Sequence, residues 1–489
     1  MNSYRKHRRR WGSVRAFCAT LLLALAWSTA TAQPATVTLR YGPFGEVAIY
    51  PTAGKATSTA LFISGDGGWN LGVVEMARHL TDMRAIVVGI DIRRYLHGAS
   101  AGQDQCRNFA ADFEGLAHAV QRHLALDDYL APVLVGYSSG ATLAYATATQ
   151  APKGTFRGAL SLGFCPDLEL ARPPCRIGAL EYTIGQAQKP VSNIVLAAAR
   201  RNATPWIAFQ GDIDQVCDAG KTRQFVASTG NAGLVWLPNV GHGFSVERNW
   251  LPQFRAAYAR LTAPGKPPAA AGPALDDLPL TAVPATAGAT PATHELFAIL
   301  LSGDGGWAGL DQDVAAALAA RGIPVVGFDS LRYFWRARTP ETAARDLARV
   351  VRGYGAAWRR SRVLLIGYSL GADVLPFLYA RLPADVRATV RSITLIGLGN
   401  TASFEFHVAN WLGASAARTM PVMPEVARMG DASILCIHGV EEADSPCPRL
   451  RGRRVAAVAA PGGHHFDGDY LLLVRRIVEH LQPAPGTVR

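Results

Sequence analysis

An internal repeat constrains the fold of this chain more than any other feature. Residues 62–69 (FISGDGGW) recur as LLSGDGGW at residues 300–307, at an offset of 238 residues. Elements of residues 89–95 recur with the same offset at residues 327–333. Ordered matches at a nearly constant offset indicate a tandem duplication. The 489 residues therefore predict two domains of roughly 200 residues each.

Each copy also contains a Gly-x-Ser-x-Gly motif directly after an apolar run of strand length. The motifs are GYSLG at residues 367–371 and GYSSG at residues 136–140, centred on Ser369 and Ser138. A serine in this setting is typical of the nucleophile elbow of an α/β-hydrolase, where a strand turns sharply into a helix. The flanking glycines allow the two elements to approach closely.

Short apolar runs alternate with helical patterns in each copy, which favours a mostly parallel sheet flanked by helices. The predicted fold class is therefore α/β, a tandem pair of α/β-hydrolase-like domains. In the second copy, strands are expected near residues 296–301, 323–328, 362–366, 392–397, 433–438 and 454–459, and helices near 313–321 and 339–352. Right-handed crossovers would bring the strand C-termini, and the groups that follow them, to one edge.

The order of segments along the chain gives the domain boundaries. Residues 1–32 have a basic start, a short apolar run and small residues before Gln33, as in a cleaved secretory signal peptide. The first α/β-hydrolase-like domain is expected at 33–262, a Pro/Ala-rich linker at 263–275, and the second and main catalytic domain at 276–489. The signal indicates export to the periplasm.

A serine hydrolase needs a base and an acid in the chain order Ser, Asp/Glu, His. In the second copy we predict Ser369 as the nucleophile, Asp444 as the acid and His464 as the base, with His465 as the competing base. In the first copy the matching residues form a candidate second triad: Ser138, Asp214 and His242.

Alignment of Cys217 with Cys447 selects the acids in both copies. It places Asp214 on Asp444. The acids that this alignment disfavours are Asp212, Glu441 and Glu442.

The reaction also needs an oxyanion hole. It is normally formed by the backbone amide after the nucleophile and by a second amide from a loop that follows an early strand. We expect the amide of Leu370 and that of Asp304 or Gly305 to provide it. The counterparts in the first copy are Ser139 with Asp66 or Gly67. The Ser-Gly-Asp-Gly-Gly-Trp loop lacks the Gly-Lys-Ser/Thr ending of a nucleotide-binding P-loop.

Charge and cysteine usage exclude several function classes. The net charge of +12 falls to +6 without residues 1–32, a mild surplus that favours contact with an anionic membrane surface, and no nucleic-acid motif is present. Six cysteines remain after Cys18 is removed, which makes disulfides plausible in an oxidising compartment, with Cys436 and Cys447 as the only pair in the second half. Without a C-x-x-C spacing, neither a metal site nor another cofactor is expected.

The motifs of the second copy, including LSGDGGW, GYSLGADVLPF and GGHHFDGDY, resemble the VirJ/AcvB family of periplasmic virulence proteins. The two-copy arrangement is similar to the longer AcvB type. This resemblance implies a serine esterase that hydrolyses the aminoacyl ester of aminoacyl-phosphatidylglycerol, typically lysyl-phosphatidylglycerol. It also implies that Ser369 is the catalytic serine.

The first copy departs from this pattern, because GYSSGAT replaces GYSLGAD and Gly243 replaces the second histidine. It is expected to have a weaker or supporting role. The alternative functions are an interaction factor for secretion-system components, as the family's link to virulence suggests, and a general esterase or lipase.

Overall fold

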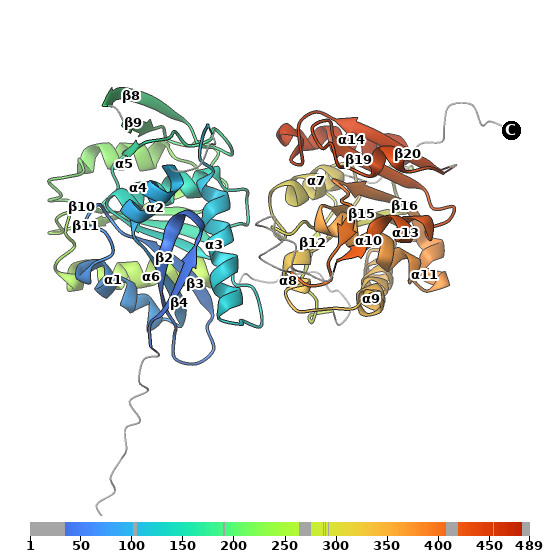
Figure 1. Ribbon diagram of the computed structural model, residues 1–489, viewed down its shortest axis with the longest axis horizontal. Helices are drawn as coiled ribbons and strands as arrows, with labels where there is room; N and C mark the ends of the chain where they lie inside the picture. The colour runs from blue at the N-terminus through green and yellow to red at the C-terminus, as the bar shows by residue number, and fades with distance from the viewer. Residues whose placement is uncertain are drawn as a thin grey trace, which may run out of the picture.

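The computed structural model describes residues 35–100, 105–188, 191–263, 275–406 and 419–481, apart from single positions 287, 289, 292 and 453. The predicted signal peptide and residues 264–274 of the predicted linker lie outside the described residues. The described chain forms two α/β units side by side, each built around its own sheet (Figure 1).

The first unit contains an eight-stranded sheet in the order β1-β2-β4-β3-β5-β6-β10-β11. Only the pairs β1–β2 and β2–β4 are antiparallel. The strands are β1 (Val37–Tyr41), β2 (Gly45–Tyr50), β3 (Ser58–Ile63), β4 (Ala85–Ile90), β5 (Val133–Tyr137), β6 (Gly158–Leu162), β10 (Trp206–Gly211) and β11 (Ala232–Leu237). A separate antiparallel sheet is formed by β7 (Asp167–Leu170), β8 (Tyr182–Gln188) and β9 (Val191–Leu196).

Helices cover both faces of the first large sheet (Figure 1). They are α1 (Leu71–Thr81), α2 (Ile92–Ser100), α3 (Phe109–His123), α4 (Ser139–Gln150), α5 (Ala219–Ser228) and α6 (Leu251–Thr262). Burial on both faces favours strands that are mostly apolar, and every residue of β3, β4 and β10 is buried.

The second unit repeats this plan with a seven-stranded sheet in the order β12-β14-β13-β15-β16-β19-β20. The strands are β12 (Leu280–Val283), β13 (Leu296–Leu301), β14 (Val325–Phe328), β15 (Arg362–Tyr368), β16 (Val390–Ile396), β19 (Ile434–Gly439) and β20 (Val455–Ala460), with β17 (Thr401–Ala402) and β18 (Met420–Pro421) paired apart. All six predicted strands are confirmed, although β14 begins after Pro324, which has no N–H to donate to a ladder.

The helices of the second unit surround this sheet in the same way. They are α7 (Gly309–Ala319), α8 (Ser330–Tyr333), α9 (Pro340–Trp358), α10 (Leu370–Ala380), α11 (Ala384–Thr389), α13 (Val422–Ala427) and α14 (Tyr470–Leu481). The two predicted helices are present, and both differ in extent from the sequence-based ranges. No helix in the described part of the chain is both long and apolar enough to cross a membrane.

The two units meet through an aromatic cluster, which we call the interdomain joint and define as Tyr129, Leu331, Trp335 and Phe406. Trp335 is 1% exposed and stacks on Phe406 with ring centroids 5.5 Å apart. The guanidinium of Arg122, from α3, lies 4.4 Å from the centre of the Trp335 ring. Helix α3 of the first unit lies on the side that faces α8 of the second (Figure 1).

Candidate active sites

Both candidate nucleophiles lie on strained strand-to-helix turns. Ser138 lies between β5 and α4 with φ 55° and ψ −124°, and Ser369 lies between β15 and α10 with φ 50° and ψ −118°. A Cβ at Gly136 would lie 2.0 Å from the carbonyl oxygen of Gly140, so only glycine fits there. Backbone conformations of this kind are held by the surrounding fold and concentrate at functional sites.

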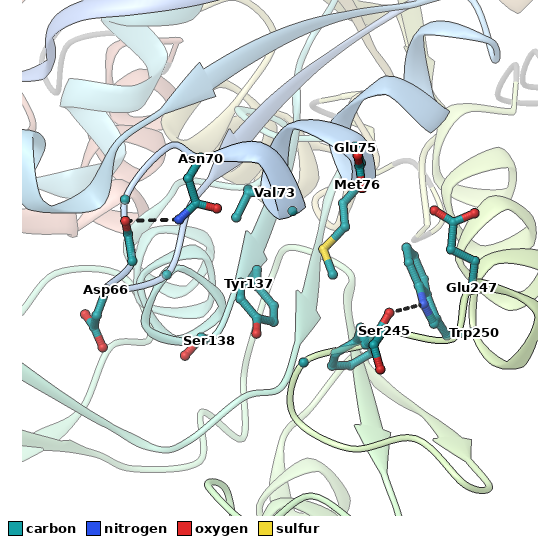
Figure 2. A pocket seen from close by; sticks show the side chains of 16 residues that line it. Asp66, Asn70, Val73, Glu75, Met76, Tyr137, Ser138, Ser245, Glu247 and Trp250 are labelled. Carbon is teal, nitrogen blue, oxygen red and sulfur yellow. Dashed lines mark hydrogen bonds between the residues drawn. The ribbon is translucent and has the colours of Figure 1, made fainter.

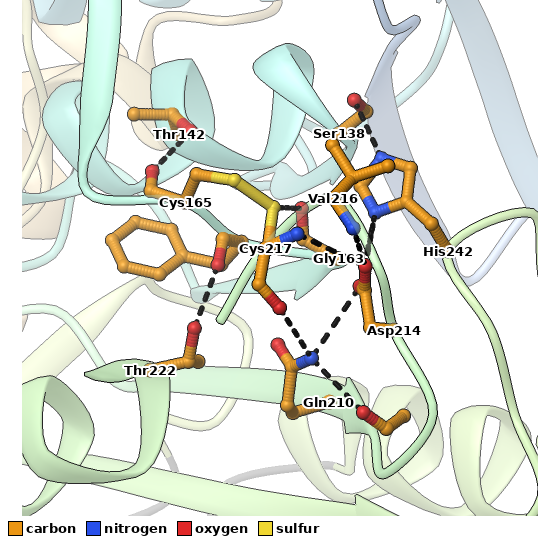
Figure 3. The surroundings of a disulfide bond; sticks show 12 residues. Ser138, Thr142, Gly163, Cys165, Gln210, Asp214, Val216, Cys217, Thr222 and His242 are labelled. Atoms are coloured by element: carbon orange, nitrogen blue, oxygen red, sulfur yellow. Dashed lines mark hydrogen bonds and ion pairs between the residues drawn. A yellow bond between two sulfur atoms is a disulfide. The ribbon is translucent and has the colours of Figure 1, made fainter. Parts of the chain in front are cut away.

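The first copy contains a complete hydrogen-bonded Ser–His–Asp triad (Figure 3). The Oγ of Ser138 lies 3.0 Å from Nε2 of His242. The other ring nitrogen of His242, Nδ1, lies 2.9 Å from Oδ2 of Asp214. Since His242 can accept a proton at Nε2 while Asp214 holds Nδ1–H, this geometry suits a general base acting on the serine hydroxyl.

The acid of this triad is held by the backbone that follows it. The amides of Val216 and Cys217 donate to Oδ1 of Asp214, over 2.8 and 3.0 Å. Burial raises the pKa of Asp214, but the hydrogen bonds from Cys217, His242 and Val216 outweigh it and hold the pKa below its usual value. Asp214 is therefore charged and can stabilise an imidazolium.

Cys217 links this acid loop to a neighbouring loop through a disulfide with Cys165 (Figure 3). Asp214, Cys217 and His242 place candidate metal-ligand atoms within 4.8 Å of one another. Because the sulfur of Cys217 is bonded to Cys165, it cannot act as a thiolate ligand. The arrangement fits a triad with a cross-linked acid loop.

In the second copy, Glu442 occupies the acid position, and the prediction of Asp444 is wrong. Oε1 of Glu442 lies 2.5 Å from Nδ1 of His464. Asp444 is exposed, and its contact is a backbone one, its carbonyl oxygen accepting from Asn400. Burial raises the pKa of Glu442, whereas hydrogen bonds from His464 and the Gly439 amide lower it, with a net result below the usual value.

The error came from treating Cys217 and Cys447 as equivalent. The predicted Cys436–Cys447 disulfide is present, but it ties the acid loop back to β19 itself, whereas Cys217 is bonded to a residue after β6. Counting from the strand ends gives the correct match. Asp214 is the third residue after the final glycine of β10, and Glu442 is the third after the final glycine of β19.

The structure separates the two candidate histidines of the second copy. His464 faces Glu442, whereas Nδ1 of His465 lies 3.0 Å from the Tyr368 hydroxyl, and burial lowers the pKa of His465. Among the described residues no hydrogen bond joins Ser369 to His464. A Cβ at Gly397 would lie 2.7 Å from Cε1 of His464, and one at Gly163 would lie 3.0 Å from Cε1 of His242. The two histidine rings therefore pack against equivalent glycines.

The predicted oxyanion loops lie directly beside the serines. A Cβ at Gly65 would lie 2.9 Å from Cβ of Ser138, and one at Gly303 would lie 3.5 Å from Cβ of Ser369. Leu370 is the first residue of α10, so its amide lies at the helix N-terminus, where N–H groups lack intrahelical partners. Leu370 and Asp304 thus lie in the segments required for an oxyanion hole.

The oxyanion loop of the second copy also contacts the first unit. A Cβ at Gly305 would lie 3.6 Å from Oε1 of Glu114, on α3. Burial and the nearby Asp304 carboxylate raise the pKa of Glu114 to about 8. The amide of Gly309, at the start of α7, donates to the carbonyl oxygen of Lys153 over 3.1 Å. The first unit thus packs against the loop beside Ser369.

The residue four positions after each serine differs between the copies. Asp373 accepts a 2.6 Å hydrogen bond from the Gly399 amide, and burial raises its pKa well above the usual value, with a further contribution from Asp304. At the equivalent position Thr142 donates to the Cys165 carbonyl oxygen over 2.6 Å. The Ser369 site therefore carries an acid that the Ser138 site lacks.

A pocket of about 430 Å³ opens beside Ser138 (Figure 2). Its lining includes the buried side chains of Val73, Met76, Phe244 and Trp250. All of its lining residues belong to the first copy.

The two mostly parallel sheets, the serine elbows and the histidines hydrogen-bonded to a carboxylate define a tandem α/β-hydrolase fold. A model of the family described as "Bacterial virulence protein (VirJ)" matches residues 57–159 and 295–484, which is more than half of the chain. The chain therefore belongs to the VirJ family, as the resemblance in its motifs implied.

Several solved structures are similar to one half of the chain. An esterase domain of a Rhodothermus marinus protein is 17% identical with a TM-score of 0.31, covering 46% of this chain and 97% of its own. An α/β serine hydrolase homologue from Coxiella burnetii is 17% identical with a TM-score of 0.30, covering 47% and 97%. A serine hydrolase without a lid from Xanthomonas campestris is 21% identical with a TM-score of 0.30, covering 47% and 94%. A search of the curated proteins found no match.

Proposed function

We propose that this chain is a serine esterase that removes the aminoacyl group from aminoacyl-phosphatidylglycerol at the Ser369 site. The observation that carries the proposal is Ser369 on a strained elbow, beside a histidine held by Glu442. The matched segment 295–484 contains all three of these residues.

The scissile bond of this substrate is a carboxylic ester, which suits this set of groups. Ser369 Oγ attacks the carbonyl carbon while His464 takes its proton, and Glu442 stabilises the resulting imidazolium. His464 then protonates the glycerol oxygen of phosphatidylglycerol as it leaves. Water attacks the aminoacyl-serine in the same way and releases the free amino acid.

The charges around Ser369 support a cationic acyl group. Asp304 is in the loop beside the serine, and Glu442, whose pKa is held below its usual value, is paired with the histidine. Carboxylates near the reacting carbon stabilise ammonium groups of the substrate and disfavour anionic acyl groups. A lysyl ester, with two ammonium groups, is the favoured substrate.

The sequence supports a periplasmic location, at the outer face of the inner membrane. Residues 1–32 have the pattern of an export signal, and the remaining chain carries a formal charge of +6. A positive protein is attracted to anionic phosphatidylglycerol-rich surfaces.

The proposal is tested with vesicles that contain lysyl- or alanyl-phosphatidylglycerol. The wild-type protein, Ser369→Ala and Ser138→Ala are incubated with each, and the aminoacyl lipid is followed by thin-layer chromatography. We expect Ser369→Ala to abolish cleavage of lysyl-phosphatidylglycerol and Ser138→Ala to retain it. If the wild-type protein leaves both lipids intact, the proposed substrate is wrong.

A further inference from the structure

The base and the acid of the first copy lie outside the part of the chain that the family model matches. The matched segment 57–159 contains Ser138 but ends before Asp214 and His242. Residues beyond it nevertheless complete a hydrogen-bonded triad. We propose that the first copy is a second catalytic centre, which hydrolyses carboxylic esters with short, apolar, uncharged acyl groups.

The side chains of the first copy have the geometry of a catalytic Ser–His–Asp triad. Each ring nitrogen of His242 has a triad partner within 3.0 Å, and the Asp214 side chain is fully buried. The disulfide to Cys165 fixes the segment whose amides donate to Asp214. If the first copy had lost its activity, nothing would require the acid loop to be cross-linked next to His242.

Apolar side chains form part of the wall of the pocket beside Ser138. Met76 and Val73 extend from α1, and Trp250 also lines the pocket (Figure 2). The indole N–H of Trp250 donates to the carbonyl oxygen of Phe244 over 2.7 Å, so the polar atom of this ring already has a partner within the protein. An acyl chain that enters here replaces water against these side chains.

The acidic side chains that line this pocket are either paired or exposed to solvent. Thr142, an uncharged residue, stands where the second copy has Asp373. Of the acids that line the pocket, Glu247 is paired with His79 over 2.8 Å, and Asp66 and Glu75 are exposed to solvent. An exposed carboxylate is screened by water and contributes little to binding of an ammonium group. The interior therefore favours an uncharged acyl chain.

The reaction balances with groups of the first copy and water alone. Ser138 Oγ bonds to the ester carbonyl carbon and gives its proton to Nε2 of His242. The amides of Ser139 and of the Asp66–Gly67 segment face the developing oxyanion, the C–O bond to the alcohol breaks, and His242 returns the proton to the alcohol. Water then attacks the acyl-serine by the same route, which yields the carboxylic acid and regenerates Ser138.

The test uses the full-length chain with Ser369→Ala, so that only the first copy can react. We expect it to hydrolyse p-nitrophenyl butyrate and to be labelled at Ser138 by a fluorophosphonate, located by peptide mass spectrometry. Adding Asp214→Asn should lower kcat/KM about 10³–10⁴-fold, because the tautomer of His242 is no longer fixed. The matched control Asp212→Asn, whose side chain only accepts from the Asn239 amide, should change it little.

The pocket is tested separately with Met76→Trp in the Ser369→Ala chain. Filling the pocket should lower kcat/KM for the butyrate ester at least tenfold while hydrolysis of the acetate ester changes less. The proposal is overturned if the folded Ser369→Ala chain, checked by circular dichroism, is neither labelled at Ser138 nor active on either ester. Since aminoacyl lipid cleavage is measured with Ser138→Ala, this failure is distinguishable from failure of the proposed function.

Discussion

The indole N–H of Trp335 donates a 2.7 Å hydrogen bond to the carbonyl oxygen of Leu126, which joins the segment after α8 of the second unit to the loop after α3 of the first. The next residue, Arg336, pairs with Asp127 over 3.2 Å. These contacts flank the interdomain joint. Glu114 and Lys153 of the first unit contact the segment that begins with the loop beside Ser369. A change in how the two units pack at the joint would therefore also change the surroundings of the second active site.

We expect Trp335→Ala to destabilise the protein by about 3–5 kcal/mol, as for other large buried aromatic side chains. Trp335→Phe, which keeps most of the ring but loses the hydrogen bond, should cost only about 1–2 kcal/mol. Urea unfolding followed by tryptophan fluorescence and circular dichroism measures both. If Trp335→Ala unfolds at the same urea concentration as the wild-type protein, the joint does not contribute to stability.

Glu442→Gln should reduce the activity of the Ser369 site by about 10³–10⁴-fold, because the acid that orients His464 becomes a neutral amide. The measurement is the rate of Ser369 labelling by a fluorophosphonate in a Ser138→Ala chain. Asp444→Asn is the matched control, since Asp444 is exposed and should leave the rate within about twofold. Equal losses in the two variants would show that Glu442 is not the acid.

Glu114 should make the protein less stable as the pH rises. Its pKa is about 8 when folded and near 4.5 in an unconstrained chain, so the folded state holds a proton that the unfolded state loses in this window. The unfolded state binds fewer protons there, and stability falls from pH 4.5 to pH 8.

Glu114→Gln should remove this part of the pH dependence. The difference between a pKa of 4.5 and one of about 8 corresponds to about 4–5 kcal/mol at pH 8.5, so we expect the variant to gain up to that much stability there and little at pH 5. Thermal unfolding at the two pH values gives the comparison. A gain that is equal at both values would contradict a raised pKa.

Replacing Cys165 and Cys217 with alanine should lower both stability and Ser138 reactivity. A disulfide of this loop length contributes about 2–4 kcal/mol, and this one also fixes the amides that donate to Asp214. The matched control replaces Cys106 and Cys175, whose disulfide joins two segments that hydrogen-bond to each other at Arg107 and Cys175. Labelling of Ser138 by a fluorophosphonate should slow only in the first variant; unchanged labelling there would mean that the disulfide does not position the acid.

The sequence could predict the elements whose signals are local. The apolar strands and the elbows at Ser138 and Ser369 are found where their patterns placed them, since glycine spacing and strand burial leave few alternatives. Glu442 was missed because two cysteines at similar positions bond to different partners. The contact of Glu114 with the second active-site loop could not be predicted, because nothing in a sequence reports how two separate units pack.

The three disulfides span 69, 52 and 11 residues of chain, and each joins two cysteines of the same copy. In an oxidising environment, the first copy can therefore form both of its covalent links while the second is still being synthesised. No bond among these six cysteines has to wait for the distant half of the polypeptide. The covalent links of the chain can thus be completed one copy at a time, in the order in which the copies are made.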